Sequence, residues 1–165
     1  MQRIARRAEL TSGLIVHYFD HKEGLYEAVY RELYRRLRAD LLARLEQRAA
    51  SPAERLQAIL DAQISDMHVQ PEVVATWLAL YAMIPERPSL SRIERAYERR
   101  LHSTLVDSLK ALELPDQEAR EIAEELMSLI DGLWPNLANP MTLTPAEARG
   151  ILRRTLLCRL PKLRS

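Results

Sequence analysis

The sequence predicts an all-α protein. Two observations support this prediction: the amino-acid composition and the positions of the helix-breaking residues. Leucine (28 residues) and alanine (20) far outnumber valine, isoleucine and threonine (21 together) in the 165-residue chain. Straight-chain residues favour helices, whereas β-branched residues favour strands. Nine prolines and four glycines divide the chain into amphipathic segments with short connections. With 47% apolar residues, the chain can bury a core as one compact body with a small appendage.

At the N-terminus, the sequence predicts two short helices around a tight turn. The first is expected over residues 3–10 and the second over 14–19, and Thr11 and Ser12 between them carry hydroxyls that cap a helix start. This arrangement is typical of the DNA-binding helix-turn-helix, and backbone N–H groups at the start of the second helix suit a phosphate. The spacing alone is equally compatible with a solvated helical hairpin that covers the body.

A long helix is expected over residues 22–50, because no proline interrupts this stretch and leucines recur at every fourth position. This apolar stripe winds around the helix, which is typical of a connector between a small module (residues 1–25) and a larger helical body (residues 26–165). Further helices are expected over 52–67, 71–84 and 90–112. The helix over 71–84 is apolar almost all round, so we expect it inside the body.

The last two segments carry opposite charges. Residues 113–131 hold seven acids and one arginine, a local charge of −6, whereas residues 149–165 hold six bases and no acid, a local charge of +6. Each segment also has an apolar face, and prolines mark the connection over 135–145. These features predict a helical hairpin, and two copies of it would form a four-helix dimer interface.

Several protein classes are excluded or disfavoured. The single Cys158 excludes a disulfide framework and any multi-cysteine metal site, and the longest uncharged apolar stretch is shorter than the roughly 20 residues of a membrane span. We expect a cytoplasmic protein without a membrane partner. His17 and His21 lie four residues apart without further ligands in reach, so no metal is expected. No nucleophile motif or phosphate loop is present, and the many glutamates lie on charged faces where solvation is expected, so neither a cofactor nor an enzyme is predicted.

One segment carries a detailed family signature. Residues 4–19 (IARRAELTSGLIVHYF), followed by Lys22 and Leu25, resemble the helix-turn-helix of the tetracycline-repressor (TetR-type) transcriptional regulators. Residues 17–19, 77–79 and 129–134 (LIDGLW) are similar to the subgroup of choline-responsive betaine-pathway repressors (BetI-type). The resemblance implies a connecting helix and an all-helical body that binds a ligand and dimerises. The chain starts where the family's second helix stands, so the usual first helix is expected to be absent, and Glu9 occupies the place of the family's turn glycine.

By position, the resemblance also implies which residues of the N-terminal module contact DNA. Thr11, Tyr18 and Lys22 are expected at phosphates, whereas Ser12, Leu14 and His17 are expected at base edges. A core position is an alternative for Tyr18.

In the body, aromatic residues define a candidate ligand site. Trp77 and Tyr81 share one helix face, and Asp131 and Trp134 share another. If the two faces converge, they form an aromatic box with one carboxylate, which suits a quaternary ammonium such as choline. Ordinary core packing is the alternative for aromatic residues at helical spacing.

The resemblance therefore implies a dimeric transcriptional regulator, most simply a repressor, that binds a double-stranded DNA operator and is released by a small-molecule effector. One alternative is a helical dimeric sensor or interaction protein that does not bind DNA. A second alternative is a truncated gene model of a complete repressor.

Overall fold

The computed structural model describes residues 2–48, 51–139 and 141–164, and it confirms the all-α fold. The described residues form eight α-helices and two short 3₁₀ helices, without a strand among them. The helices are α1 (Gln2–Arg7), α2 (Ser12–Phe19), α3 (Lys22–Arg48), α4 (Pro52–Gln63), α5 (Pro71–Tyr81), α6 (Pro88–Lys110), α7 (Asp116–Leu137) and α8 (Pro145–Arg159), with 3₁₀ turns at Ile84–Glu86 and Pro161–Arg164.

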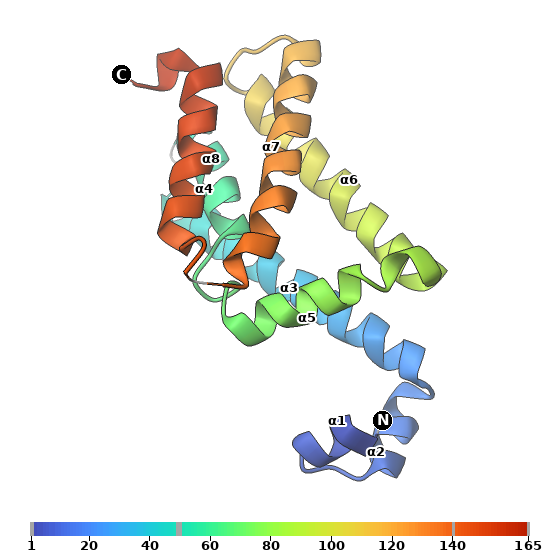
Figure 1. Cartoon of the computed structure of the whole chain (residues 1–165). Helices are drawn as coiled ribbons and strands as arrows, with labels where there is room; N and C mark the ends of the chain where they lie inside the picture. Colours follow the sequence, from blue (N-terminus) through green and yellow to red (C-terminus); the bar gives the residue numbers. More distant parts are fainter. Residues whose placement is uncertain (1, 49–50, 140, 165) are drawn as a thin grey trace.

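The molecule has a small unit at one end and a larger helical body at the other. We call residues 2–25, which comprise α1, α2 and the start of α3, the head. Figure 1 shows that α3 runs from the head into the body, where it packs against α4 and α6. Helices α7 and α8 lie side by side as the predicted hairpin, and α6 packs along α7. The predicted division after residue 25 falls inside the uninterrupted α3 and stays a prediction.

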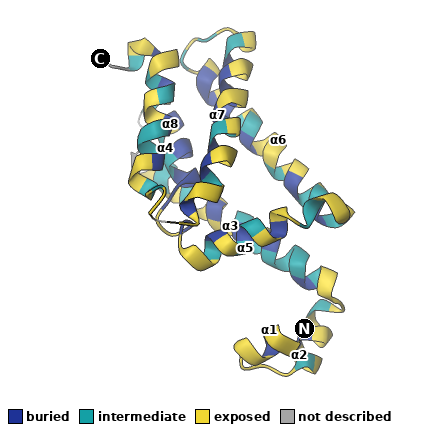
Figure 2. Ribbon diagram, viewed as in Figure 1, coloured by how far each residue is buried: buried dark blue, intermediate teal, exposed yellow. Residues whose placement is uncertain are grey.

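Buried side chains form three clusters of very different size. The largest fills the body between α4, α6, α7 and α8, and a second lies where α3, α5 and α6 meet. The head has a small cluster of its own, made by Ala5, Ile15 and Leu25. In Figure 2, exposed residues dominate α1 and α2, whereas buried residues gather in the body. The head therefore has little apolar packing of its own to hold its helices together.

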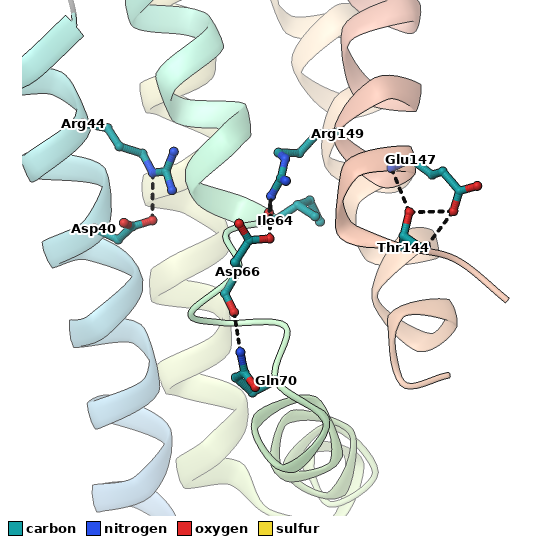
Figure 3. A network of polar contacts seen from close by, with 8 residues as sticks. All are labelled: Asp40, Arg44, Ile64, Asp66, Gln70, Thr144, Glu147 and Arg149. Atoms are coloured by element: carbon teal, nitrogen blue, oxygen red, sulfur yellow. Dashed lines mark hydrogen bonds and ion pairs between the residues drawn. The ribbon is translucent and has the colours of Figure 1, made fainter. Parts of the chain in front are cut away.

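Two helices begin with a capping box that fixes their first turn. At α4, Ser51 Oγ accepts a hydrogen bond from the Glu54 N–H at 3.2 Å, and the Glu54 carboxylate accepts one from the Ser51 N–H at 2.9 Å. Thr144 and Glu147 make the same pair of bonds at α8, as Figure 3 shows. Because Pro52 and Pro145 follow these caps at the first helical position, both starts are set by local sequence.

The turn between α4 and α5 is held from α8. Arg149 donates hydrogen bonds to the Ile64 carbonyl at 2.8 Å and to the Asp66 carboxylate at 3.1 Å, and Gln70 donates to the Asp66 carbonyl at 3.1 Å (Figure 3). The prediction that α4 reaches residue 67 was therefore wrong. The chain leaves the helix at Ile64, where a distant arginine supplies the partner for the exposed carbonyl.

The predicted connection over 135–145 also begins later in the structure. Helix α7 continues through Pro135 to Leu137, because a proline in the last turn of a helix removes only one backbone hydrogen bond, here the one to the Asp131 carbonyl. Helix α8 starts at Pro145, where the predicted connection ends, and the Thr144 capping box satisfies its first turn. Among the described helices, none is both long enough and apolar enough to cross a membrane.

Candidate functional site

The second helix of the head is oriented by one buried residue. Ile15 packs against Ala5 and Leu25, with Phe19 and Val29 at the edge of this cluster. At the start of α2, the Thr11 hydroxyl accepts a hydrogen bond from the Leu14 N–H at 3.2 Å and so caps the helix. Because α2 buries only Ile15 fully, most of its surface faces solvent. That surface is available to a large partner.

The residues expected at DNA lie on this surface. Thr11, Leu14, His17, Tyr18 and Lys22 are exposed, and Ser12 is half-buried. The side chain of Tyr18 is not in the core, because 73% of the residue is exposed. The His17 and Tyr18 rings contact each other edge-on, with their centroids 5.5 Å apart. Lys22 lies beside this surface, its Nζ 5.4 Å from the Tyr26 ring centroid.

The turns of the head have demanding backbone geometry. Glu9 adopts a φ of 55° in the turn where the resembled family has glycine, a conformation that costs a residue with a Cβ about 1 kcal/mol or more. At the α2–α3 turn, a Cβ on Gly24 would lie 2.3 Å from the Phe19 carbonyl oxygen, so only glycine fits there. The Gly24 N–H donates to His21 Nδ1 at 3.0 Å, which gives His21 a capping role.

The head also carries positive charge on its exposed surface. Arg3, Arg6 and Arg7 of α1 are exposed, as is Lys22 at the start of α3. None of these four takes part in a salt bridge within the described part of the chain. The chain's net charge is only +1, so any electrostatic attraction of the head to a polyanion would come from this local patch.

In the body, the four residues predicted to form a ligand site converge on one cavity. Trp77 and Tyr81 reach it from α5, and Asp131 and Trp134 reach it from α7. The Trp77 ring centroid lies 6.1 Å from that of Tyr81 and 5.9 Å from that of Trp134. The cavity has a volume of about 30 Å³, which is room for one or two water molecules.

Sequence analysis missed three further aromatic residues around this cavity. Tyr34 of α3 and Tyr97 of α6 line it, and their rings stack with centroids 4.0 Å apart. Tyr30 lies one turn before Tyr34 and is fully buried. Tyr30 and Tyr34 lie four residues apart on one face of α3, and this spacing could have indicated that both face the same part of the body. We refer to Tyr30, Tyr34, Trp77, Tyr81, Tyr97 and Trp134 as the aromatic cluster, which includes both tryptophans of the chain.

Polar groups at the cavity are mostly hydrogen-bond donors from tyrosine and tryptophan side chains. The Tyr97 hydroxyl donates to Gln63 Oε1 at 2.7 Å. Burial raises the pKa values of Tyr30, Tyr34, Tyr81 and Tyr97 above the usual range of a phenol, and Glu94 adds to the effect on each. These hydroxyls therefore keep their protons at neutral pH and act as donors to any acceptor nearby.

Three acidic side chains gather around the aromatic cluster. Glu94 of α6 was expected on a solvated face, but it is buried and accepts hydrogen bonds from the Tyr30 and Tyr34 hydroxyls. Desolvation and the nearby Glu94 and Glu98 raise the pKa of Asp131 to about 6. Desolvation and Glu94 raise the pKa of Glu98. Within the described residues, none of the three acids forms a salt bridge, although the positive charge of Arg95 opposes the rise in the Glu98 pKa. Glu94 is buried, whereas Glu98 and Asp131 are exposed.

This arrangement favours one class of ligand. Aromatic faces attract cations through their negative quadrupole, and the carboxyl group of Asp131 in the cavity lining adds to that attraction when it is ionised. An anion would meet repulsion from the same acids. Among the described residues, no group of three or more histidine, cysteine or acidic side chains is arranged to hold a metal ion.

Comparison with known proteins identifies the family. The family described as "Bacterial regulatory proteins, tetR family" matches residues 1–29, and "BetI-type transcriptional repressor, C-terminal" matches residues 52–160. The HTH-type transcriptional regulator BetI of Cronobacter sakazakii is 44% identical over 133 residues, which is 80% of this chain and 65% of that protein. BetI of Burkholderia mallei is 37% identical over 150 residues, covering 91% of this chain and 75% of the relative.

The fold agrees with these matches. The chain superimposes on the crystal structure of a transcriptional regulator from Rhodococcus sp. Rha1 with a TM-score of 0.82 and 22% identity, over 98% of this chain and 84% of that one. The chain spans less than two thirds of the length of the Cronobacter sakazakii relative. From its N-terminal helix-turn-helix match to its C-terminal body, the chain belongs to the tetR family of regulatory proteins and is BetI-like.

Proposed function

We propose that the protein is a DNA-binding transcriptional regulator that acts as a dimeric repressor and is released from its operator by a small cationic effector. The observation that carries the effector part is the aromatic cluster, which surrounds a cavity lined by Asp131 and close to Glu94. Family membership and the exposed basic head support the DNA part. This role requires no enzymatic activity and places the protein in the cytoplasm with the bacterial DNA.

The head has the surface that an operator would need. Lys22, Thr11 and Tyr18 would contact phosphates, while Ser12, Leu14 and His17 would reach base edges in the major groove. The Thr11 oxygen accepts the capping bond from the Leu14 N–H, and its O–H would still donate to a phosphate.

A quaternary ammonium such as choline would enter the cavity among Trp77, Tyr81, Trp134 and Asp131. At about 30 Å³, the cavity is far below the roughly 300 Å³ or more that a typical ligand pocket offers. Binding would therefore require aromatic side chains to move apart. Tyr81 is 38% exposed and lies at the solvent side of the cluster, where such an opening costs least.

The α7–α8 hairpin is the proposed dimer interface. Its apolar inner face packs into the body core, and Arg159 and Glu125 form an ion pair between the two helices at 3.4 Å. Most of the opposite charges lie on outer surfaces, for example Glu121 and Glu124 on α7 and Arg153 on α8. A second copy related by two-fold symmetry would bring the acidic face of one hairpin against the basic face of the other.

In such a dimer, α3 would set the distance between the two heads. Successive major grooves on one DNA face lie about 34 to 36 Å apart, so a small tilt of α3 changes how well both heads fit. Effector and operator would then oppose each other, each lowering the affinity for the other by the same factor.

The DNA part is tested by fluorescence anisotropy of the whole chain with DNA from upstream of its own gene, over a series of salt concentrations. Specific binding with a steep salt dependence supports the proposal. A folded dimer that fails to bind this DNA contradicts it and favours a helical sensor or interaction protein. Light scattering at micromolar concentration tests the dimer directly.

The effector part is tested by calorimetry with choline. The matched pair of variants is Trp134→Leu, which removes an aromatic face, and Leu129→Ala, which truncates a half-buried apolar residue of the same helix outside the cavity lining. Choline binding that weakens only in Trp134→Leu supports the site. No heat and no thermal shift with choline in the unmodified protein removes the cationic effector.

A further inference from the structure

Two tyrosines of α3 are tied to one acid of α6. The hydroxyls of Tyr30 and Tyr34 both donate hydrogen bonds to Glu94 Oε2 and lie 3.2 Å from each other. Glu94 is 6% exposed and Tyr30 is fully buried, so water does not compete for these bonds. Hydrogen bonds to a charged group in such surroundings are among the stronger polar contacts of a protein. We call Tyr30, Tyr34 and Glu94 the α3–α6 latch.

Tyr34 belongs to the latch and to the ligand cavity at once. Its ring lines the cavity, stacks on Tyr97 at 4.0 Å and meets the Trp77 ring at 4.8 Å in an edge-on contact. Glu94 is not among the lining residues and is separated from the cavity by the tyrosine hydroxyls. A cation that reaches the buried Glu94 carboxyl group from the cavity past Tyr34 therefore takes the place of the Tyr34 hydroxyl.

The latch is also connected to the head by continuous packing. Val29, the residue before Tyr30, packs against both the head cluster and the cluster at the α3–α5–α6 junction. A second tie between α3 and the start of α6, the Glu23 to Arg87 ion pair at 2.8 Å, lies still closer to the head. Because α3 is one uninterrupted helix, a shift at Tyr34 moves the segment that carries the head.

We infer that Glu94 is a shared acceptor for which the bound cation and the tyrosine hydroxyls of α3 compete, and that this competition couples the effector cavity to the DNA-binding head. The inference rests on the proposed function and names its regulation. With the cavity empty, Tyr30 and Tyr34 hold α3 against α6. With a cation present, Glu94 turns to the ligand and α3 is released, which is the differential affinity that coupling between two sites requires. Tyr30 and Tyr34 are thus positioning residues, and Glu94 contacts the ligand.

The double variant Tyr30→Phe/Tyr34→Phe tests this competition, with Tyr26→Phe as its control. Tyr26 lies on the same helix, and its contacts are with Lys22 and Arg87 through the ring face, which phenylalanine retains. In the double variant choline no longer has to displace two hydroxyls, so it should bind roughly tenfold more tightly. The factor by which saturating choline weakens DNA binding should fall toward one. Tyr26→Phe should behave as the unmodified protein in both assays.

The inference predicts tighter choline binding together with a smaller effect of choline on DNA binding. This combination distinguishes the latch from a purely structural role. Loss of packing would weaken choline and DNA binding together, and that result overturns the inference, as does an unchanged coupling factor. Glu94→Gln gives an independent check, because it keeps an acceptor of the same size but removes the charge. It should weaken choline binding about tenfold or more. Unchanged choline affinity in Glu94→Gln also overturns the inference.

Hydrogen exchange of the ligand-free chain tests the latch independently of whether choline is the effector. Amides of residues 22–34 should exchange faster in the double variant than in the unmodified protein and in Tyr26→Phe, while α7 and α8 stay unchanged. Absence of choline binding in the unmodified protein counts against the proposed effector alone. Equal exchange over residues 22–34 in all three proteins counts against the latch alone.

Discussion

At the scale of single residues, the candidate ligand site depends on acidic side chains, and the sequence pattern does not reveal which of them is buried. Asp131 and Trp134 were predictable because they share a helix face with clear spacing. Glu94 was expected on a solvated surface, since most glutamates of amphipathic helices lie there. Its burial becomes evident only when the Tyr30 and Tyr34 hydroxyls are placed beside it by the packing of α3 on α6.

Asp131 should make cation binding depend on pH. Its pKa is raised to about 6, so the carboxyl is mostly protonated at pH 5 and mostly ionised at pH 7. Choline keeps its charge throughout, so its affinity should rise by up to about tenfold between pH 5 and 7. Because the folded-state pKa lies above the usual value near 3.8, this group's contribution to folding stability declines as pH rises through about 4 to 6.

The check is calorimetry with choline at several pH values. Asp131→Asn should remove the rise and keep the weaker affinity of the low-pH state. Glu124→Gln, at an exposed position of the same helix, should leave the profile of the unmodified protein unchanged. A rise of the same size in Asp131→Asn would assign the pH dependence to other groups.

Lys22 should contribute to DNA binding without reading sequence. The residue is exposed at the start of α3, beside the surface of α2. Lys22→Ala should weaken binding to all DNA sequences alike and reduce the slope of log K against log salt concentration by about 1 for each head. The measurement is a salt series of anisotropy titrations. Arg92→Ala, an exposed charge on α6, is the control, and equal slopes in both variants would refute the phosphate contact.

At the scale of elements, local signals were reliable where they are self-contained. The N-cap Thr11 and the proline at position 52 mark helix starts that the structure shows in place. The end of α4 was not predictable, because Arg149 satisfies the Ile64 carbonyl from 85 positions further along the chain. The continuation of α7 through Pro135 was not predictable either, because a proline in the last turn of a helix removes only one backbone hydrogen bond and the helix can end before or after it.

The Thr144 capping box should measurably stabilise α8 and, through it, the body. Thr144→Ala removes the hydroxyl that accepts from the Glu147 N–H, and we expect the free energy of unfolding to fall by about 1 kcal/mol. Thr142→Ala, at an exposed position two residues earlier, should change stability much less. Urea unfolding followed by circular dichroism provides the comparison, and equal losses in the two variants would show that the box contributes nothing.

At the scale of the whole molecule, a small head and a large body share one helix, α3. The body has a large core, whereas the head is held by Ala5, Ile15 and Leu25 and by its continuity with α3. Sequence periodicity predicted the long connector, and the family resemblance gave the head its expected role. The α3–α6 latch, which joins the cavity to α3, could not be predicted from the sequence. Glu94 lies 64 residues from Tyr30 and 60 residues from Tyr34 in the chain, so only the three-dimensional structure brings them together.

The most direct test of the account is the affinity of the whole chain for the DNA upstream of its own gene, measured with and without saturating choline at fixed salt. A cation that binds in the body and releases α3 should weaken specific DNA binding by about 5-fold to 150-fold, the usual range of coupling between two sites. Specific binding that choline leaves unchanged, although calorimetry shows choline bound, would contradict the account.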